Sequence, residues 1–346
     1  MKNIALTGGG TGGHIFPLLA IYNYLKKDSN LNFIWFGDED GLEAKIANEN
    51  LIPFKYVPCG KINRFFTIKN FFEPLKNITG IFFGIYYLIL YKIDFIIAKG
   101  GYVSLPLCIA GFILRKKIYI HESDTTSGIV NNFISKFATK IFYTFPNEKI
   151  DQKKHILIGQ ILNEELLKGI IKRDDLEEDV EEKLEVLVIA GSQGSTSIFE
   201  SIKSILNNLN DINFTIILGD KNLHFRQEFE KFKNVTLYDF VSQKELGTIY
   251  QKTDIAISRA GATTLWELYF FGIHTIIVPL LNSAQNHQIN NANYFKNEFQ
   301  SDVLNDDENL SLEIFRKLTK YKDFKKNGLN LKNFSYSLEQ IEKEIL

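Results

Sequence analysis

The chain has 346 residues, of which 45% are hydrophobic and 23% charged, and its formal net charge is −1. This length gives room for two domains with separate cores, and the composition argues against disorder. A charge near zero argues against a protein that grips a nucleic-acid backbone, so no nucleic-acid partner is expected. The two cysteines, Cys59 and Cys108, lack zinc-ligand spacing, which indicates a reducing compartment and no metal.

Strand-like apolar runs alternate with helical stretches through the first half of the chain. Buried parallel strands give continuous apolar runs of this kind, and the helices that connect them cover the sheet. The runs are residues 3–7, 32–37, 53–58, 94–99, 117–122, 140–145 and 155–159. We therefore expect a parallel sheet covered by helices.

The first loop of this half reads GGGTGGHIFP over residues 8–17 and precedes a helical stretch. Dense glycine lets backbone N–H groups approach an anion, and the helix behind them adds the positive end of its dipole. The pattern fits G-x-G-x-x-G, so a dinucleotide loop, another phosphate cradle and a plain tight turn are all compatible with it. In a nicotinamide-dependent oxidoreductase, Asp38 or Asp40 would bind the ribose.

Residues 78–93, ITGIFFGIYYLILYKI, form the most apolar segment. It is shorter than the roughly 20 residues of a membrane-spanning helix. The segment is either a core helix or a helix that docks on anionic lipid, as four basic residues upstream suggest, namely Lys61, Arg64, Lys69 and Lys76. The N-terminus has no signal-peptide pattern, so we expect the chain to stay in the cytosol.

An acidic stretch, DDLEEDVEE at residues 174–182, follows the first half and is expected to be a solvated linker or an exposed helix. The alternation then restarts, with strand-like runs at residues 184–191, 213–220, 234–241, 254–261 and 274–281. A second sheet of the same kind is predicted, so the chain is expected to be a tandem of two α/β domains.

Glycine-rich or polar clusters follow five of the predicted strands, at residues 8–14, 99–104, 121–128, 191–195 and 258–264. Ligands of open parallel sheets bind beyond the carboxyl ends of the strands. Two facing domains would bring all five clusters to one cleft, where one half binds a donor and the other an acceptor.

Several side chains in the second half suit a sugar nucleotide. In the loop GSQGS, Ser192 and Gln193 can bond phosphate oxygens beside a helix N-terminus. Glu267, one turn inside the next such helix, can take both hydroxyls of a ribose, although an exposed helical Glu has the same pattern. Neutral polar side chains that suit a sugar follow on a loop and helix, namely Gln285, His287, Gln288 and Asn291.

In these motifs the sequence resembles the MurG family of peptidoglycan glycosyltransferases, within glycosyltransferase family 28. TGGGTGGHIFP, GDEDGLEAK, KGGYVSLP, HES, GSQGS, SRAGATTLWEL and HQINNA occur in the family's order over about residues 3–293. The resemblance implies a GT-B fold, in which two Rossmann-like parallel-sheet domains face an interdomain cleft. It implies UDP-N-acetylglucosamine (UDP-GlcNAc) as donor, an undecaprenyl-diphospho-MurNAc-pentapeptide as acceptor, inversion at the anomeric carbon, and no cofactor or metal. It also implies a peripheral enzyme on the cytoplasmic face of an anionic cell membrane, acting in cell-wall synthesis.

The family's organisation implies three parts of this chain. Residues 1–160 would form an N-terminal domain that faces the acceptor and the membrane, and residues 161–330 a C-terminal domain that binds the UDP-sugar. Residues 331–346 would form a helix that crosses back to the N-terminal domain.

The resemblance also implies site residues. Ser192 and Gln193 would bind the donor diphosphate, and the backbone at Val241 would bind the uracil. Further donor contacts would come from Thr263, Thr264 and Glu267 around the ribose and from Gln288 and Asn291 on the sugar. The acceptor diphosphate would meet Thr11, Gly12, Gly13, His14, Gly100, Gly101 and Tyr102, so the first loop would cradle phosphates of a lipid.

Inverting transfer needs a base that takes the proton of the acceptor hydroxyl while UDP leaves on the opposite face. His14 is the first candidate because an imidazole titrates near neutral pH. A histidine that only caps the loop and bonds phosphate has the same pattern, and the carboxylates of Glu122 and Asp124 compete for the role. Helix dipoles and backbone N–H groups would stabilise the leaving diphosphate.

Two positions depart from the family's pattern. Asp124 stands where the family commonly has an Asn that contacts the donor sugar, which removes a hydrogen-bond donor and adds a charge. After Gly159, residues 160–163 read QILN, so the family's Arg for the diphosphate is missing, and Lys168 and Arg173 are the candidate substitutes. These departures keep two alternatives open: a related UDP-hexose lipid glycosyltransferase, and a non-catalytic sugar-nucleotide-binding protein of the cell envelope.

Overall fold

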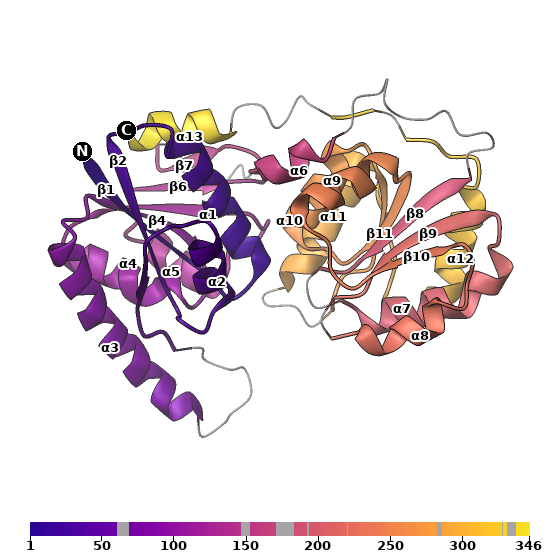
Figure 1. Cartoon of the computed structure of the whole chain (residues 1–346), viewed down its shortest axis with the longest axis horizontal. Coiled ribbons are helices and arrows are strands. Elements are labelled where there is room, and N and C mark those ends of the chain that lie inside the picture. The colour runs from indigo at the N-terminus through magenta and orange to yellow at the C-terminus, as the bar shows by residue number, and fades with distance from the viewer. Residues whose placement is uncertain are drawn as a thin grey trace. The chain divides into compact units, whose positions relative to one another are not determined.

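The computed structural model describes residues 1–60, 69–146, 153–170, 183–191, 194–219, 221–281, 286–326, 328–330 and 337–346. The chain divides into two compact units, each built on a sheet with helices against it (Figure 1). Unit 1 comprises Met1–Ile161 and Ser335–Leu346, and unit 2 comprises Leu162–Phe334. The acidic stretch at residues 174–182 lies outside the described residues.

The described residues of unit 1 form a parallel sheet of seven strands in the order β3-β2-β1-β4-β5-β6-β7. Each strand overlaps one of the seven apolar runs predicted from the sequence, because a strand covered on both faces needs apolar residues throughout. The strands are β1 (Lys2–Gly8), β2 (Leu31–Gly37), β3 (Phe54–Tyr56), β4 (Phe95–Gly100), β5 (Lys117–Glu122), β6 (Lys140–Tyr143) and β7 (His155–Leu157). The helices are α1 (Gly12–Leu25), α2 (Leu42–Glu49), α3 (Lys69–Leu90), α4 (Ser104–Ile113), α5 (Ile129–Ser135) and α13 (Ser337–Ile345).

Successive residues of β1 point to opposite faces of this sheet and enter two different cores. Ile4 and Leu6 lie in the core that α1 and α13 complete, to which α13 contributes Ile341 and Ile345. Ala5 lies in the second core, together with buried residues of α3, α4 and α5. Helices therefore cover both faces of the sheet.

Unit 2 repeats this plan with a parallel sheet in the order β10-β9-β8-β11-β12-β13. The strands are β8 (Leu184–Ile189), β9 (Ile212–Ile217), β10 (Val235–Tyr238), β11 (Ile255–Ser258), β12 (His274–Ile277) and β13 (Asp302–Val303). The helices are α6 (Glu164–Lys168), α7 (Thr196–Ile205), α8 (Arg226–Phe229), α9 (Gln243–Lys252), α10 (Ala262–Phe270), α11 (His287–Phe299) and α12 (Leu310–Lys320), with short 3-10 turns η2 (Leu206–Asn208) and η3 (Leu223–Phe225). Two helix-covered parallel sheets confirm the predicted α/β class.

The order of the strands places glycine-rich loops side by side. In unit 1 the chain leaves β1 toward β2 on one side, and β4 pairs with β1 on the other, so the loops after β1 and β4 are neighbours. In unit 2, β8 and β11 have the same relation. Ligands of open α/β sheets bind beyond the strand ends where the strand order reverses in this way. Each unit thus has one such position.

Helix α3 has both a buried and an exposed side, so it contributes to the core and docking on lipid stays a prediction. Leu88, and Ile93 just after the helix, are fully buried, whereas Phe82 and Phe83 are 66% and 43% exposed. Among the described residues, no helix combines the length and apolar character needed to cross a bilayer. Of the upstream basic residues, Lys76 pairs with Glu73 at 3.1 Å; Lys61 and Arg64, and the Lys69 side chain, lie outside the description.

Candidate active site

The loops after β1 and β4 in unit 1 lie against each other. Thr11 Oγ1 is 3.1 Å from His14 Nδ1, and the backbone N–H of His14 donates to the carbonyl oxygen of Thr11 at 3.0 Å. Gly101 has a φ of +76°, and a Cβ built on it would lie 2.9 Å from Gly9 O and 3.4 Å from His14 Nδ1. Only glycine combines this backbone conformation with so close an approach. Tyr102 follows, and its ring lies against the glycine-rich loop.

Glu43 of α2 holds the glycine-rich loop in place by hydrogen bonds in the interior of unit 1. Its side chain is fully buried, and its carboxylate accepts the N–H of Gly10 and the N–H of Asp38, both at 3.2 Å. The Gly10 N–H is therefore already used. Gly12 and Gly13 begin α1, where the first N–H groups of a helix have no partner within it, so a phosphate would find its donors there.

Glu122, at the end of β5, is a buried carboxylate with its own donors. Its oxygens accept the N–H of Asp124 at 3.1 Å, the N–H of Gly128 at 3.3 Å and the Asn131 side-chain amide at 2.9 Å. Burial raises the pKa of Glu122, while the buried ammonium of Lys99 opposes that rise. These contacts fix the turn after β5 and favour a positioning role for Glu122, and the choice of base between His14 and Asp124 stays a prediction.

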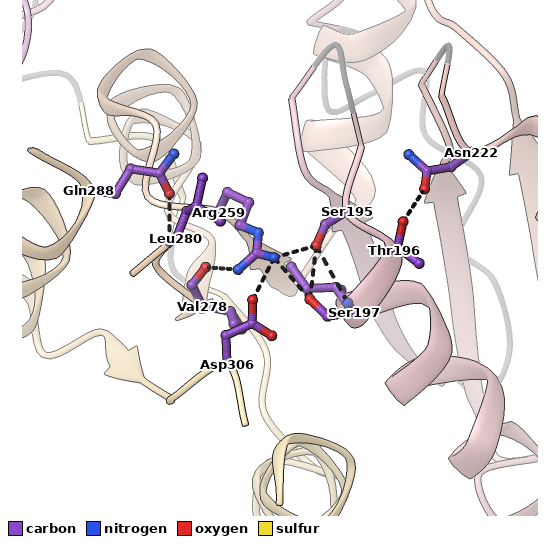
Figure 2. A network of polar contacts seen from close by, with 10 residues as sticks. Ser195, Thr196, Ser197, Asn222, Arg259, Val278, Leu280, Gln288 and Asp306 are labelled. Atoms are coloured by element: carbon purple, nitrogen blue, oxygen red, sulfur yellow. Dashed lines mark hydrogen bonds and ion pairs between the residues drawn. The ribbon is translucent and has the colours of Figure 1, made fainter. Parts of the chain in front are cut away.

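In unit 2 one guanidinium joins several loops, as Figure 2 shows. Arg259 follows β11 and donates from Nη2 to Ser195 Oγ at 2.7 Å and Ser197 Oγ at 2.9 Å. Its Nη1 donates to the carbonyl oxygen of Val278 at 3.0 Å, and Nη2 pairs with Asp306 Oδ2 at 2.8 Å. We call these five residues the Arg259 cluster. It holds the loops after β8, β11, β12 and β13 together.

The N-terminus of α7, where the sequence predicts a phosphate site, is fixed by this cluster and by its own caps. Ser195 Oγ accepts the N–H of Ile198 at 3.5 Å, and Thr196 Oγ1 donates to Asn222 Oδ1 at 3.1 Å (Figure 2). Ser192 and Gln193, the residues expected to touch the diphosphate, lie outside the described residues, as does Gln285.

Helix α11 is tied to the loops on which a sugar is expected. Gln288 Oε1 accepts the N–H of Leu280 at 2.9 Å, and the Asn291 side-chain amide donates to the carbonyl oxygen of Ala260 at 3.1 Å. Asn291 is fully buried, so in this structure it supports the loop after β11. Its contact with a sugar stays a prediction.

Helix α10 starts at the end of the loop after β11 and carries the expected ribose residues. Thr263 and Thr264 are half-buried in its first turn. Glu267 is 7% exposed, and its Oε2 accepts a hydrogen bond from the Tyr250 hydroxyl of α9 at 3.1 Å. Burial raises the pKa of Glu267 to about 7. Val241, expected to bind uracil through its backbone, is buried just before α9.

The segment after Gly159, in which the family's Arg is missing, starts a helix of its own in this chain. Asn163 caps the N-terminus of α6, where its Oδ1 accepts the N–H of Glu165 at 3.0 Å. Lys168, one of the two cations suggested as a substitute, forms an ion pair with Glu165. Arg173 lies outside the described residues. Within the part of the chain that the structure describes, no group of three or more His, Cys, Asp or Glu could hold a metal ion.

Sequence patterns do not single out Glu43, Tyr250 or Arg259. Glu43 and Arg259 lie inside quoted motifs, GDEDGLEAK and SRAGATT, and a charged residue directly after a strand is a signal that could have pointed to Arg259. Tyr250 has no such signal, because its contact depends on how two helices meet.

Models of two domains of one family match the chain. The N-terminal domain of glycosyltransferase family 28 matches residues 4–143, and the C-terminal domain of that family matches residues 185–344. The chain belongs to glycosyltransferase family 28. As a member of family 28, the protein is a glycosyltransferase. This confirms the family that the sequence motifs indicate, and it rules out the nicotinamide-dependent oxidoreductase.

Relatives within family 28 are similar over almost the whole chain. A UDP-N-acetylglucosamine--N-acetylmuramyl-(pentapeptide) pyrophosphoryl-undecaprenol N-acetylglucosamine transferase of Clostridium perfringens (strain SM101 / Type A) is 35% identical over 329 residues, which cover 94% of this chain and 90% of the relative. A transferase of the same name from Clostridium botulinum (strain Alaska E43 / Type E3) is 34% identical over 340 residues, covering 95% and 92%.

Solved structures agree with this fold. The crystal structure of Acinetobacter baumannii MurG matches with a TM-score of 0.72 at 21% identity, over 99% of this chain and 100% of that one. A UDP-GlcNAc 2-epimerase from Neisseria meningitidis matches with a TM-score of 0.71 at 15% identity, over 100% and 99%. At such identities the likeness concerns the fold alone.

Proposed function

We propose that this family 28 enzyme transfers N-acetylglucosamine from UDP-GlcNAc to the C4 hydroxyl of an undecaprenyl-diphospho-MurNAc-pentapeptide, with inversion at the anomeric carbon. The supporting observation is the 35% identity, over 94% of the chain, to a transferase whose name states this donor group and this acceptor. In peptidoglycan synthesis this reaction completes the lipid-linked disaccharide.

Unit 2 would bind the donor. Its β8 and β11 loops stand at the reversal of strand order, and α7 and α10 direct their N-termini into these loops. The diphosphate would lie at the N-terminus of α7, where Ser192 and Gln193 belong, and the ribose at Glu267. The uracil would lie at Val241, and the sugar near Gln288.

Unit 1 would bind the acceptor diphosphate at the N-terminus of α1, through Thr11, Gly12 and Gly13. His14 would act as the base, with its Nδ1 held by Thr11 and its Nε2 directed at the C4 hydroxyl. As Nε2 takes the proton, the C4 oxygen attacks the anomeric carbon of the donor sugar. The bond from that carbon to the β-phosphate oxygen breaks, and UDP leaves with the electron pair.

The charge that develops on UDP needs stabilisation without the family's Arg. The ten-residue helix α7 offers its N-terminal N–H groups, and Arg259 places a guanidinium against Ser195, the residue that caps this helix. A helix N-terminus fixed by hydrogen bonds stabilises developing negative charge without reorganising. Arg259 would act here through the loop that it holds.

Unit 1 has a surface that suits a peripheral place on the cytoplasmic face of the membrane. Large apolar side chains between 43% and 70% exposed gather on three of its helices, and we call them the α3–α5 apolar surface: Leu75, Ile78, Phe82, Phe83, Tyr86, Ile89 and Leu90 of α3, Phe112 and Ile113 of α4, and Ile129 and Phe133 of α5. Phe137 joins α4 and α5, with its ring 4.7 Å from that of Phe112 and 5.7 Å from that of Phe133. Exposed Arg115, Lys117 and Lys136 lie next to these residues in the chain and would meet anionic headgroups.

The test is UDP release by the purified protein from UDP-GlcNAc, with and without a short-chain lipid-linked MurNAc-pentapeptide. Acceptor-dependent release restricted to UDP-GlcNAc is the expected result. UDP-glucose and UDP-galactose are run alongside because Asp124 stands where the family commonly has Asn. Release from one of these donors instead would favour the related lipid glycosyltransferase, and donor binding without release would contradict transferase activity.

A further inference from the structure

Glu267 meets a single phenol in the interior of unit 2. Glu267 is 7% exposed on α10, and Tyr250 is fully buried on α9. The Tyr250 hydroxyl donates to Glu267 Oε2 at 3.1 Å. Within the described part of the chain, Glu267 makes no other hydrogen bond through its side chain. One carboxylate oxygen is thus bound from the protein side.

Tyr250 is itself held in place. Its ring packs against Phe271 with centroids 5.3 Å apart, inside the core that also contains Leu187 and Ala256. Its backbone carbonyl accepts a hydrogen bond from Lys326 Nζ at 2.6 Å. Burial raises the pKa of the Tyr250 hydroxyl well above its ordinary value, so this group remains a hydrogen-bond donor throughout the neutral range.

Two opposing influences set the ionisation of Glu267. Burial raises its pKa to about 7, and the hydrogen bond from Tyr250 lowers it. In the described part of the chain, no charged side chain on a neighbouring element shifts the pKa of Glu267. Helix α9 faces Glu267 with Tyr250, and β11, β12 and α11 place no charged side chain that shifts this pKa. His274 at the start of β12 is engaged with Asp302 at 3.0 Å. Near neutral pH the carboxylate form therefore depends on this one phenol.

We propose that Tyr250 is a positioning residue for the donor, which holds Glu267 as a carboxylate with one oxygen bound and the other directed to the ribose hydroxyls, so that donor affinity rises with pH through neutrality. This inference rests on the proposed function, since it takes Glu267 to bind the ribose. A carboxylate can accept hydrogen bonds from both ribose hydroxyls, whereas the protonated acid has lost part of that capacity. Burial by itself favours the uncharged acid, and the hydrogen bond from Tyr250 opposes it.

Tyr250→Phe keeps the ring and removes only the hydroxyl. A hydrogen bond to a charged group corresponds to a displacement of about one to two pH units in the titration of Glu267. The Kd for UDP-GlcNAc, measured by calorimetry between pH 5.5 and 9, should therefore be about 5- to 50-fold higher than wild type at pH 7 and within about twofold of it at pH 9. The kcat at saturating donor should change little, because the lost contact acts on binding.

Tyr321→Phe is the matched control. It removes a phenol-to-carboxylate hydrogen bond of the same kind in the same unit, from Tyr321 to Asp302 Oδ2 at 2.8 Å, and should leave the pH profile of donor binding unchanged. The wild-type protein provides a second measurement that needs no variant. The pH dependence should disappear with a UDP-GlcNAc analogue that lacks both ribose hydroxyls.

Two results would overturn the inference while leaving the proposed function intact. One is a Tyr250→Phe profile that superimposes on that of wild type. The other is a pH dependence that persists with the analogue. Glu267→Gln tests the premise of the inference. If this variant bound UDP-GlcNAc as tightly as wild type, Glu267 would not bind the ribose, and the inference about Tyr250 would be wrong as well.

Discussion

The Arg259 cluster allows a quantitative test of what fixes the donor loops. Arg259→Met removes the guanidinium but keeps an apolar stem of similar length, so Asp306 loses its partner at a site where both side chains are less than one-fifth exposed. Loss of one partner costs about 3–5 kcal/mol for a buried ion pair, and a fully exposed pair contributes about 0–1 kcal/mol. For this partly buried pair, we expect Arg259→Met to lower the free energy of unfolding of unit 2 by about 2–3 kcal/mol.

Fluorescence can follow unit 2 alone. The chain has two tryptophans, and a Trp35→Phe background leaves Trp266 of unit 2 as the reporter of urea unfolding. Asp306→Asn should cost less than Arg259→Met. The double variant should be more stable than the sum of the two losses predicts, with a coupling of about 1–2 kcal/mol.

A control and a clear refutation follow from the same structure. Arg226→Met removes a cation that pairs with Glu230 and Asp239, but the Arg226 side chain is 39% exposed, so the loss of stability should be much smaller than that of Arg259→Met. Losses at Arg259 and Asp306 that add to within about 0.5 kcal/mol would show that the pair does not act as a unit. The reasoning from burial and geometry would then be wrong.

Three further outcomes are expected. His14→Ala should lower turnover by at least about 100-fold with the fold intact, and a loss below about tenfold would assign the proton to a nearby carboxylate. Glu43→Gln places an amide N–H against backbone donors, so it should cost about 1–3 kcal/mol of stability and raise the acceptor KM with unchanged donor Kd; an unchanged acceptor KM would separate Glu43 from the acceptor loop. Phe82→Ser with Phe83→Ser should weaken binding to anionic liposomes, unlike Leu51→Ser at another exposed apolar position. Equal liposome binding by the two proteins would reject the α3–α5 apolar surface.

The strands were predictable because each one follows from a local pattern of apolar residues. Buried parallel strands are apolar throughout, so the runs at residues 117–122 and 254–261 stand out without any knowledge of partners. The exception in unit 2 is β13, which has only the residues Asp302–Val303 and therefore no apolar run to recognise. A strand this short depends on its pairing with β12.

The positions of the site loops were predictable from the sequence, but the side chains that hold these loops in place were not. Glycine spacing located the loop before α1, yet nothing local shows that a carboxylate from α2 binds it, because Glu43 reaches Gly10 across 33 residues of sequence. The same holds for Arg259 and Ser195, which are 64 residues apart. Contacts between loops depend on strand order, and strand order is a property of the whole sheet.

The division of the chain makes unit 2 an insertion within unit 1, since residues on both sides of Leu162–Phe334 belong to unit 1. The ribosome therefore finishes unit 2 before it delivers α13, whose Ile341 and Ile345 complete a core begun by β1. During synthesis, this core of unit 1 therefore stays incomplete and its apolar face stays uncovered, while unit 2 can already fold. A destabilising substitution in α13 would thus appear as a folding defect of unit 1, most of which is synthesised before unit 2.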